Sequence, residues 1–360
     1  MPLVGHFPDK TPAVSPSLGA TSPLCQDLME PAIVKSKRAS MFSHVLSVRL
    51  TAIERAADNI NVYEVVAVDG ENLPAFKAGA HVSISLSAAI TRSYSLINPQ
   101  DGGACYRFAV SLDPASRGGS LLIHSAWKVG DVVSIAPPRN NFRLIPSSGA
   151  PVFIAGGIGI TPMLGMIGDM HRNMRPWTLH YAARSPAVAA FLPEIDAYQA
   201  SGGGRAKVYY DDANGKPSLD LKSVVSAIPA GSHIYCCGPA PMLDAFQAIT
   251  AEIPGQFVHV EYFAAPEPVK PEGEFKVVLA RSGQTFTVNP GQSILDAVLE
   301  LGINIESECR EGICGSCEVR VLEGIPDHRD MVLTPDQRQS NAMMMICCSG
   351  SKTEQLVLDI

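Results

Sequence analysis

Residues Ser307–Val319 read SECREGICGSCEV, and this stretch decides the fold expected for the C-terminal part of the chain. Its cysteines are spaced Cys309-x4-Cys314-x2-Cys317, and a fourth candidate follows at Cys347. The pattern C-x4-C-x2-C…C is the spacing of plant-type [2Fe–2S] clusters. A planar two-iron cluster needs four converging thiolates, which a loop with three cysteines and one distant cysteine can supply. We therefore predict a [2Fe–2S] cluster on these four residues.

Two other interpretations of the cysteines stay open, a structural zinc site and free buried thiols. Structural zinc usually takes paired C-x2-C units, and the loop has only one such pair. Cys347 also has a competitor, because Cys348 is adjacent and side chains alternate between the faces of an expected strand. Only one of the two can face the iron. Gly312 and Gly315 suit a loop whose backbone passes close to inorganic sulfides.

The residues around the cysteine loop predict a domain over residues 274–360 that contains both strands and a helix. FKVVLA and QTFTV flank the turn RSG and are expected to form a hairpin. Ser293 is a suitable N-cap for a helix that Gly302 can end, since the apolar residues between them share one face. Residues 265–273 are rich in proline and charge and have no apolar period, which predicts a stiff linker.

Upstream, residues 149–264 show apolar strands that alternate with helical stretches, which predicts a mostly parallel sheet. The glycine-rich turn GGIG (156–159) follows a strand and precedes a helix, and its glycines would let a dinucleotide pyrophosphate approach the backbone. It departs from the Rossmann G-x-G-x-x-G, and any tight turn can use glycine. CCG (236–238) follows another strand, at an edge where ligands bind, although small buried residues explain its cysteines equally well.

Residues 44–148 contain short β-rich stretches separated by Gly, Pro, Asn and Asp, which is typical of a small β-barrel. The motif RSYS (92–95) places an arginine, an aromatic ring and a hydroxyl on one strand. Arginine can hold a phosphate bidentately and tyrosine can stack on a ring system, yet many barrels carry such a pair on their surface. RGGS (117–120) adds backbone N–H groups and a hydroxyl suited to an anion.

Length and composition limit the remaining possibilities. A chain of 360 residues suits two or three domains, and residues 1–43, rich in Pro, Ser, Thr and Ala, are expected to be a poorly ordered extension. A net charge of −7 without a basic stripe argues against nucleic acid as a partner. The start of the chain lacks the features of a secretory signal, so we expect a cytoplasmic protein with reduced thiols. Pro151–Gly168 is uncharged, but its prolines and glycines favour a buried strand, turn and helix over a membrane span.

Together, RSYSL, RGGS, GGIGITPML, YCCGPAPML, VEYF and C-x4-C-x2-C…DHRDMVL…C resemble the phthalate dioxygenase reductase family, which includes the reductases of vanillate demethylases and carnitine monooxygenases. The resemblance covers about Val45 to Ile360, and RNNF after Pro138 agrees with it, whereas Cys348 and the N-terminal extension depart from the pattern. It implies an antiparallel flavin barrel, an α/β NAD domain and, over residues 274–360, a ferredoxin domain of the β-grasp (α+β) type, in that order. Related reductases with an N-terminal ferredoxin domain usually carry FAD, so the domain order favours FMN.

The resemblance also implies roles for residues of the barrel. Arg92, Tyr94 and Ser95 would line the flavin, with Gly119 and Ser120 near its phosphate.

In the NAD domain, Gly157 and Gly159 belong to the turn expected at the pyrophosphate, and Thr161, Cys237 and Gly238 would lie near the nicotinamide. Phe263, which ends VEYF, looks like the family's aromatic residue that packs against the flavin ring. No side-chain acid or base is expected to carry the hydride step, so no catalytic residue is assigned.

The function implied is an NADH-dependent reductase that passes electrons through the flavin and the cluster to the terminal component of a Rieske-type oxygenase or demethylase. A flavin is needed because hydride delivers two electrons while the cluster accepts one. The alternatives are a reductase for a cytochrome P450 or another acceptor, and a non-catalytic electron carrier that senses redox state. The family mostly prefers NADH to NADPH.

Overall fold

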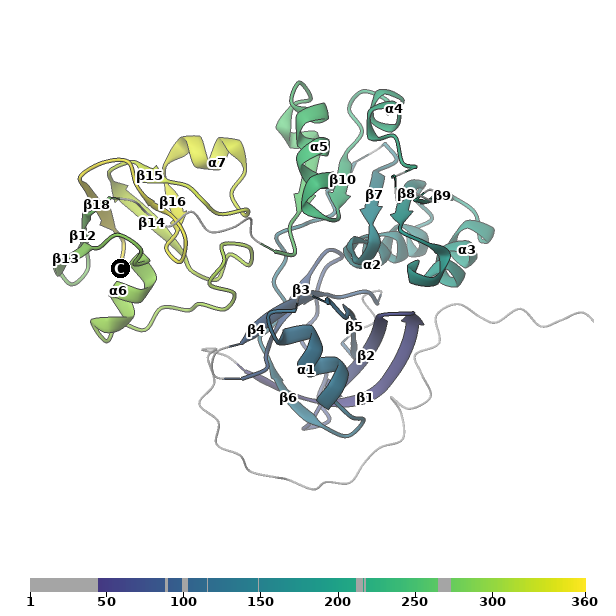
Figure 1. Cartoon of the computed structure of the whole chain (residues 1–360), viewed down its shortest axis with the longest axis horizontal. Helices are drawn as coiled ribbons and strands as arrows, with labels where there is room; N and C mark the ends of the chain where they lie inside the picture. The colour runs from purple at the N-terminus through teal and green to yellow at the C-terminus, as the bar shows by residue number, and fades with distance from the viewer. Residues whose placement is uncertain are drawn as a thin grey trace, which may run out of the picture.

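The computed structural model describes residues 45–87, 90–98, 103–114, 116–147, 149–211, 216, 218–264 and 273–360. The predicted N-terminal extension lies outside these residues, as does the predicted linker apart from Gly273. Figure 1 shows a barrel, an α/β domain above it and a smaller α+β domain to one side. The predicted fold class is confirmed, since the large sheets of the three domains are, in chain order, antiparallel, parallel and mixed. The domain boundaries at single-residue precision stay predictions.

The first domain is a six-stranded antiparallel sheet in the order β4-β3-β6-β1-β2-β5. An isolated bridge between Leu96 and Phe108 joins the end of β4 to β5 and closes the barrel. Apolar side chains of alternate strand positions fill its interior. Its elements are β1 (Leu46–Ala57), β2 (Ile60–Ala67), β3 (His81–Ser85), β4 (Thr91–Ser95), β5 (Tyr106–Ser111), α1 (Gly119–Ala126) and β6 (Val132–Ile135).

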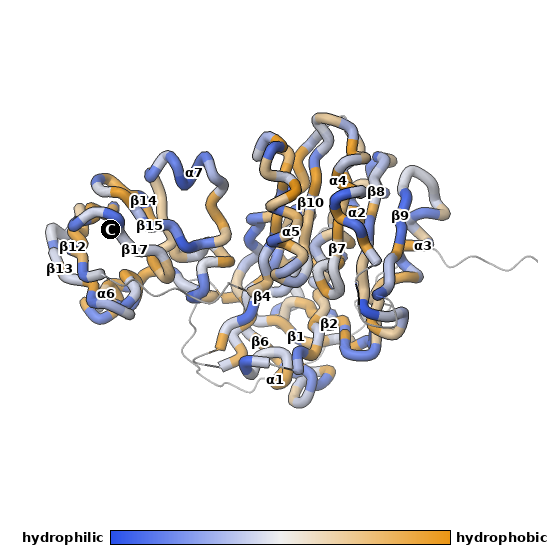
Figure 2. The backbone as a smooth tube through the Cα atoms, turned by 45° about the horizontal axis from the view of Figure 1, so that its top comes forward, coloured by the Kyte–Doolittle hydropathy of each residue, from blue (hydrophilic) through white to orange (hydrophobic). Residues whose placement is uncertain are grey.

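The second domain is a parallel sheet in the order β11-β10-β7-β8-β9 with a core on each face. Figure 2 shows hydrophobic colour along β7, whose side chains alternate between the two cores. Helices α2 and α3 cover one face, and α4 and α5 cover the other. The elements are β7 (Val152–Gly156), α2 (Ile160–Arg172), β8 (Trp177–Ala183), α3 (Leu192–Ala200), β9 (Gly204–Tyr210), α4 (Leu221–Ser226), β10 (Ile234–Cys237), α5 (Ala240–Thr250) and β11 (Val258–Glu261).

The third domain has a mixed sheet in the order β13-β12-β18-β14-β16, in which β12 and β18 are parallel. The predicted hairpin is present as β12 and β13, and Ser293 caps α6 by accepting from the N–H of Asp296 at 3.0 Å. The elements are β12 (Phe275–Leu279), β13 (Thr285–Val288), α6 (Ile294–Glu300), β14 (Glu318–Glu323), β15 (Pro326–Asp327), α7 (Pro335–Ser340), β16 (Met343–Met345), β17 (Gly350–Ser351) and β18 (Gln355–Leu358).

The uncharged stretch Pro151–Gly168 forms β7, a 3₁₀ turn (Gly157–Gly159) and most of α2, as the strand-turn-helix interpretation predicts. Its apolar side chains are buried between the parallel sheet and the neighbouring helices. Among the residues that the structure describes, no helix combines the length and the hydrophobicity needed to cross a membrane.

Candidate functional site

Each of the four predicted cluster ligands has another cysteine thiol beside its own. The thiols of Cys309 and Cys314 share a hydrogen bond, and the thiol of Cys347 is hydrogen-bonded to those of both Cys317 and Cys348. The hydrogen bond from Cys309 lowers the pKa of Cys314. A [2Fe–2S] cluster takes four cysteine thiolates for its two irons, so the predicted ligands suit one such cluster.

The same arrangement fits a zinc ion poorly. Zinc needs three or four ligands around a single point. Over the described ranges of the chain, no group of three or more His, Cys, Asp or Glu side chains is placed to hold one metal ion. The C-x4-C-x2-C…C spacing therefore favours the two-iron cluster, and the identity of its four ligands stays a prediction.

The segment Glu306–Cys317, here called the cluster loop, turns backbone N–H groups toward its own sulfurs. Glu311 donates its N–H to Cys309 Sγ at 3.3 Å, and Cys309 donates its N–H to Cys314 Sγ at 3.5 Å. Gly312 allows this path because it has a φ of 73°, a left-handed conformation that side chains disfavour. Hydrogen bonds to sulfur stabilise thiolates and tune a bound cluster.

The structure corrects the predicted secondary structure around the fourth ligand. The sequence predicts a strand at Cys347 and Cys348, but both lie in a turn after β16. The prediction is wrong because the apolar run leaves the sheet at Met345, whose carbonyl accepts from Ser349 N at 3.0 Å and closes the turn. The turn brings the thiol of Cys347 to Cys317, while the thiol of Cys348 lies beside that of Cys347 and 3.8 Å from Met345 O.

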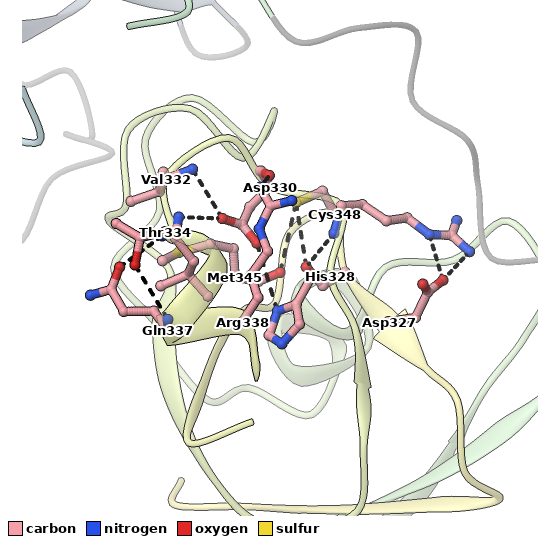
Figure 3. A network of polar contacts seen from close by, with 12 residues as sticks. Asp327, His328, Asp330, Val332, Thr334, Gln337, Arg338, Met345 and Cys348 are labelled. Atoms are coloured by element: carbon pink, nitrogen blue, oxygen red, sulfur yellow. Dashed lines mark hydrogen bonds and ion pairs between the residues drawn. The ribbon is translucent and has the colours of Figure 1, made fainter. Parts of the chain in front are cut away.

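A second loop, Asp327–Leu333, packs against the cluster loop. Its residue Met331 donates its N–H to Gly312 O at 2.8 Å. Figure 3 shows how Asp330 holds this loop, since its carboxylate accepts from two N–H groups of the same loop and its carbonyl accepts from Arg338. Asp330 is fully buried. This network fixes one side of the cluster loop and gives a physical role to part of the DHRDMVL motif.

The predicted flavin contacts on β4 are divided between its two faces. Arg92 and Tyr94 lie on one face and Ser95 on the other, because side chains alternate along a strand. The ring of Tyr94 stacks on Phe108 with 5.7 Å between centroids, and burial raises the pKa of Tyr94. The structure thus brings Arg92 and Tyr94 to a common face and separates the side chain of Ser95 from them.

Helix α1 brings the predicted phosphate contacts next to Arg92. The helix begins at Gly119, and a Cβ on that residue would lie 2.8 Å from Cγ of Arg92. Arg92 also donates from Nη2 to the carbonyl of Arg117 at 3.2 Å. Ser120 follows in the first turn of the helix. A helix N-terminus beside an arginine suits a phosphate, so these residues fit the phosphate end of a flavin.

The glycine-rich turn packs against β10 at the carboxyl edge of the parallel sheet. Gly157 has a φ of 54°, and a Cβ on Gly159 would lie 2.2 Å from the carbonyl oxygen of Cys237. Thr161 is buried and donates its hydroxyl to Ile158 O at 3.0 Å. Ligands of parallel sheets bind at this edge, where Gly157 leaves the backbone open to a pyrophosphate and Gly159 allows the turn to pack on β10.

The adjacent cysteines of β10 belong to opposite faces of the sheet. Cys236 lies in the core beneath α4 and α5, and Cys237 lies in the core beneath α2 and α3. Burial raises the pKa of Cys236 to about 12 and that of Cys237 well above its ordinary value. Gly238 follows, and a Cβ there would lie 2.8 Å from Met242 Sδ. Cys237 is therefore the cysteine on the side of the glycine-rich turn.

Glu261 is a residue of this edge that the sequence analysis does not single out. It ends β11 and is the strand partner of Cys237. Its Oε2 is shielded from solvent and has no hydrogen-bond partner among the described residues, and burial raises the pKa of its carboxyl to about 8. A protonated carboxyl near neutral pH can hydrogen-bond a polar ligand. An acidic residue at the carboxyl end of a parallel strand is the signal that could have found it.

Phe263, the predicted aromatic contact of the flavin, follows two residues later. Its side chain is 39% exposed, which is unusual for a large ring in this chain. The free face suits a residue that packs on a planar cofactor. This position agrees with the role that the resemblance implies, which stays a prediction.

Two family models match the chain. Residues 153–248 match the oxidoreductase NAD-binding domain, and residues 277–351 match the 2Fe-2S iron-sulfur cluster binding domain.

Relatives extend the match over most of the chain. The chain is 46% identical over 315 residues to the phenoxybenzoate dioxygenase subunit beta of Ectopseudomonas oleovorans, covering 88% of this chain and 97% of that protein. It is 33% identical to a solved phthalate dioxygenase reductase described as modular for electron transfer from pyridine nucleotides to [2Fe-2S], with a TM-score of 0.63 over 88% of this chain and 98% of the other. The chain belongs to the phthalate dioxygenase reductase family.

This phthalate dioxygenase reductase family member is an electron-transfer oxidoreductase, which confirms the predicted class of enzyme. Other similar proteins have different names. The tetrachlorobenzoquinone reductase of Sphingobium chlorophenolicum is 45% identical over 317 residues, covering 88% of this chain and 98% of that protein. An intact type IV self-sufficient cytochrome P450 monooxygenase matches with a TM-score of 0.80 and 35% identity over 92% of this chain. This chain spans only 43% of that P450 chain.

Proposed function

We propose that the chain is an NADH-dependent reductase that passes electrons through a flavin and a [2Fe–2S] cluster to the terminal component of a Rieske-type oxygenase or demethylase. The two thiol pairs, Cys309 with Cys314 and Cys317 with Cys347, carry the proposal, because they fit a two-iron cluster in the same chain as an NAD-binding domain. The oxygenase names of the phenoxybenzoate and phthalate relatives support the choice of partner.

The chain's own residues supply placement. A bound flavin would take two electrons together from NADH and release them one at a time. It is needed because NADH gives up two electrons as a hydride, whereas the cluster accepts one. In the turn that we propose for the pyrophosphate, Gly157 keeps the backbone open and Gly159 lets the turn pack against Cys237, while Cys237 and Glu261 line the edge where the nicotinamide would lie. The buried carboxyl of Glu261 would hydrogen-bond the nicotinamide while protonated. No side-chain acid or base is required for hydride transfer itself.

We assign the flavin as FMN. Arg92 and the start of α1 at Gly119 offer a phosphate site, and Ser120 and Tyr94 are further contacts that we propose. Ser95, whose side chain lies on the other face of β4, would contribute through its backbone. The ferredoxin domain follows the flavin barrel, the order that favours FMN over FAD. Release of the flavin by heat and its separation by chromatography test this assignment, and recovery of FAD would overturn it. We place the enzyme in the cytoplasm, where thiols stay reduced.

Anaerobic stopped-flow mixing with NADH tests the function. We expect the flavin absorbance to bleach first and the cluster absorbance to follow. No flavin reduction would instead favour the redox-sensing carrier. The reduced enzyme is then mixed in turn with a Rieske oxygenase, a cytochrome P450 and a quinone. We expect the Rieske oxygenase to be reduced fastest, and the quinone is the second candidate because of the tetrachlorobenzoquinone reductase relative.

A further inference from the structure

The cluster loop is attached to the barrel by three of its carboxylates. Glu311 pairs with Arg117, with 2.5 Å between Oε1 and Nη1. Arg139 pairs with Glu306 at 2.7 Å through Nη2 and with Glu308 at 3.2 Å through Nε. The loop that carries the predicted cluster ligands therefore contacts the domain that is predicted to hold the flavin.

Glu308 is the centre of this contact. Its side chain is only 1% exposed, and its two carboxylate oxygens accept from Arg139 Nε and, at 2.5 Å, from the hydroxyl of Ser83. A buried carboxylate is stable when it is paired and hydrogen-bonded. Both of these partners belong to the barrel, so the pairing is complete only while the two domains touch. The next residue in the chain is the predicted ligand Cys309.

On the barrel side, the contact leads to the strand of the flavin site. The hydroxyl of Ser83 lies 2.9 Å from that of Ser93 on β4. Ser93 stands between Arg92 and Tyr94 in the RSYS motif. A line of hydrogen bonds thus runs from the flavin strand to the residue before the first cluster ligand.

The RNNF loop that carries Arg139 is itself fixed in the barrel. Asn140 donates to Ala78 O at 2.9 Å, and the N–H of Phe142 donates to Asn140 Oδ1 at 3.1 Å. The next residue, Asn141, reaches the other domain and donates to the carbonyl of the predicted ligand Cys314 at 2.8 Å. Arg139 and Asn141, two residues apart in one anchored loop, therefore bind the cluster loop at two places, near Glu308 and at Cys314.

We propose that Arg139 and Glu308 are positioning residues that fix the distance and orientation between the flavin and the cluster. The proposal rests on the proposed function, because it concerns the passage of electrons between these two groups. A bound flavin would take the hydride of one NADH and a proton from solvent. It would return to its oxidised state by losing two protons and sending two electrons singly across this contact, the cluster giving the first to the terminal acceptor before it takes the second. The pair touches neither donor nor acceptor and acts by holding the domains together.

The test uses full-length holoenzyme with Arg139→Gln, Glu308→Gln and the double variant. We expect NADH to bleach the flavin at the wild-type rate, because these residues lie outside the NAD domain, while cluster reduction slows about tenfold or more. Small-angle scattering of the oxidised variants should give a larger radius of gyration. The double variant should be no slower than the slower single variant, because both changes break the same contact.

Arg281→Gln is the matched control. It also removes one arginine, but its pair with Asp359, at 2.9 Å, lies within the ferredoxin domain. We expect wild-type kinetics and dimensions for this variant.

Wild-type cluster reduction and an unchanged radius of gyration in Arg139→Gln would overturn the positioning role. If Glu308→Gln loses the visible absorbance of the cluster, Arg139→Gln alone tests the positioning role, because this substitution is in the barrel and does not change the sequence of the cluster loop. A wild-type enzyme whose flavin is not bleached by NADH would instead reject the proposed function, so the two failures are distinguishable.

Discussion

Two pairs of adjacent cysteines lie in different backbone settings. Cys236 and Cys237 are on β10, where strand alternation sends the two thiols into separate cores. Cys347 and Cys348 lie in a turn, where the two thiols lie beside each other and that of Cys347 also meets Cys317. The difference teaches that two neighbouring cysteines do not define a ligand. The local path of the backbone decides whether a thiol packs as a small apolar group or meets other thiols.

The largest expected effect comes from the turn. Cys347→Ser should abolish the visible absorbance of the cluster, because it removes one thiol of the pair with Cys317. Cys348→Ser should retain that absorbance after identical reconstitution. Equal iron and absorbance in the two variants would break the distinction between the two thiols of the turn.

The dependence of stability on pH tests the burial of Glu261, the partner of Cys237 on the neighbouring strand. Burial raises the pKa of its carboxyl from 4.5 to about 8, so between these values the native protein holds a proton that the unfolded chain has lost. The proton that the native protein retains on Glu261 therefore contributes to the free energy of unfolding. This contribution is fully present below pH 4.5 and is lost as the pH rises through about 8. Urea midpoints measured from pH 5 to 9, roughly the span of this titration, should fall more steeply for the wild type than for Glu261→Gln. Parallel curves would contradict the raised pKa.

The close approach of the glycine-rich turn to Cys237 gives a smaller effect. Gly159→Ala should destabilise the NAD domain by about 1–3 kcal/mol and weaken NADH binding, because its Cβ would lie 2.2 Å from a backbone oxygen. Gly157→Ala meets no atom within 4 Å and carries only the strain of a φ of 54°, about 1 kcal/mol. Denaturant unfolding and NADH titration compare the two. A larger loss of stability and of NADH affinity in Gly157→Ala than in Gly159→Ala would refute the close contact between Gly159 and Cys237.

The smallest effect separates the two strand cysteines from each other. Cys236→Ser should destabilise the protein by about 1–3 kcal/mol, because it buries a hydroxyl, and should leave the rate of flavin reduction by NADH unchanged. Cys237→Ser carries a similar cost but should also slow flavin reduction, because this thiol lies beside Glu261 and the glycine-rich turn. Thermal unfolding and stopped-flow rates measure both effects. Equal rates in the two variants would remove Cys237 from the nicotinamide edge.

The features that could be predicted from the sequence are local. The spacing of the cysteines, the hairpin of β12 and β13, and the cap at Ser293 each depend on neighbouring residues. Helix α1 is missing from the sequence analysis because it has eight residues and starts with a glycine, Gly119, so it offers little helical pattern.

The features that could not be predicted depend on contacts between distant residues. Ser83 and Glu308 are separated by 225 positions, and nothing near either residue announces the other. Glu261 has an ordinary place in its strand, and only the packed sheet shows that its carboxyl is shielded. The thiol pairing with Cys347 likewise needs the turn after β16, which an apolar run conceals.

The central place of β18 in the third sheet has a consequence for biosynthesis. This strand, Gln355–Leu358, pairs with β12 on one side and β14 on the other, and it follows every cysteine of the predicted cluster site. During translation the four thiols all leave the ribosome before the strand that joins their domain together. The sheet of this domain can therefore close only after all four cysteines have been synthesised, because β18 is its central strand.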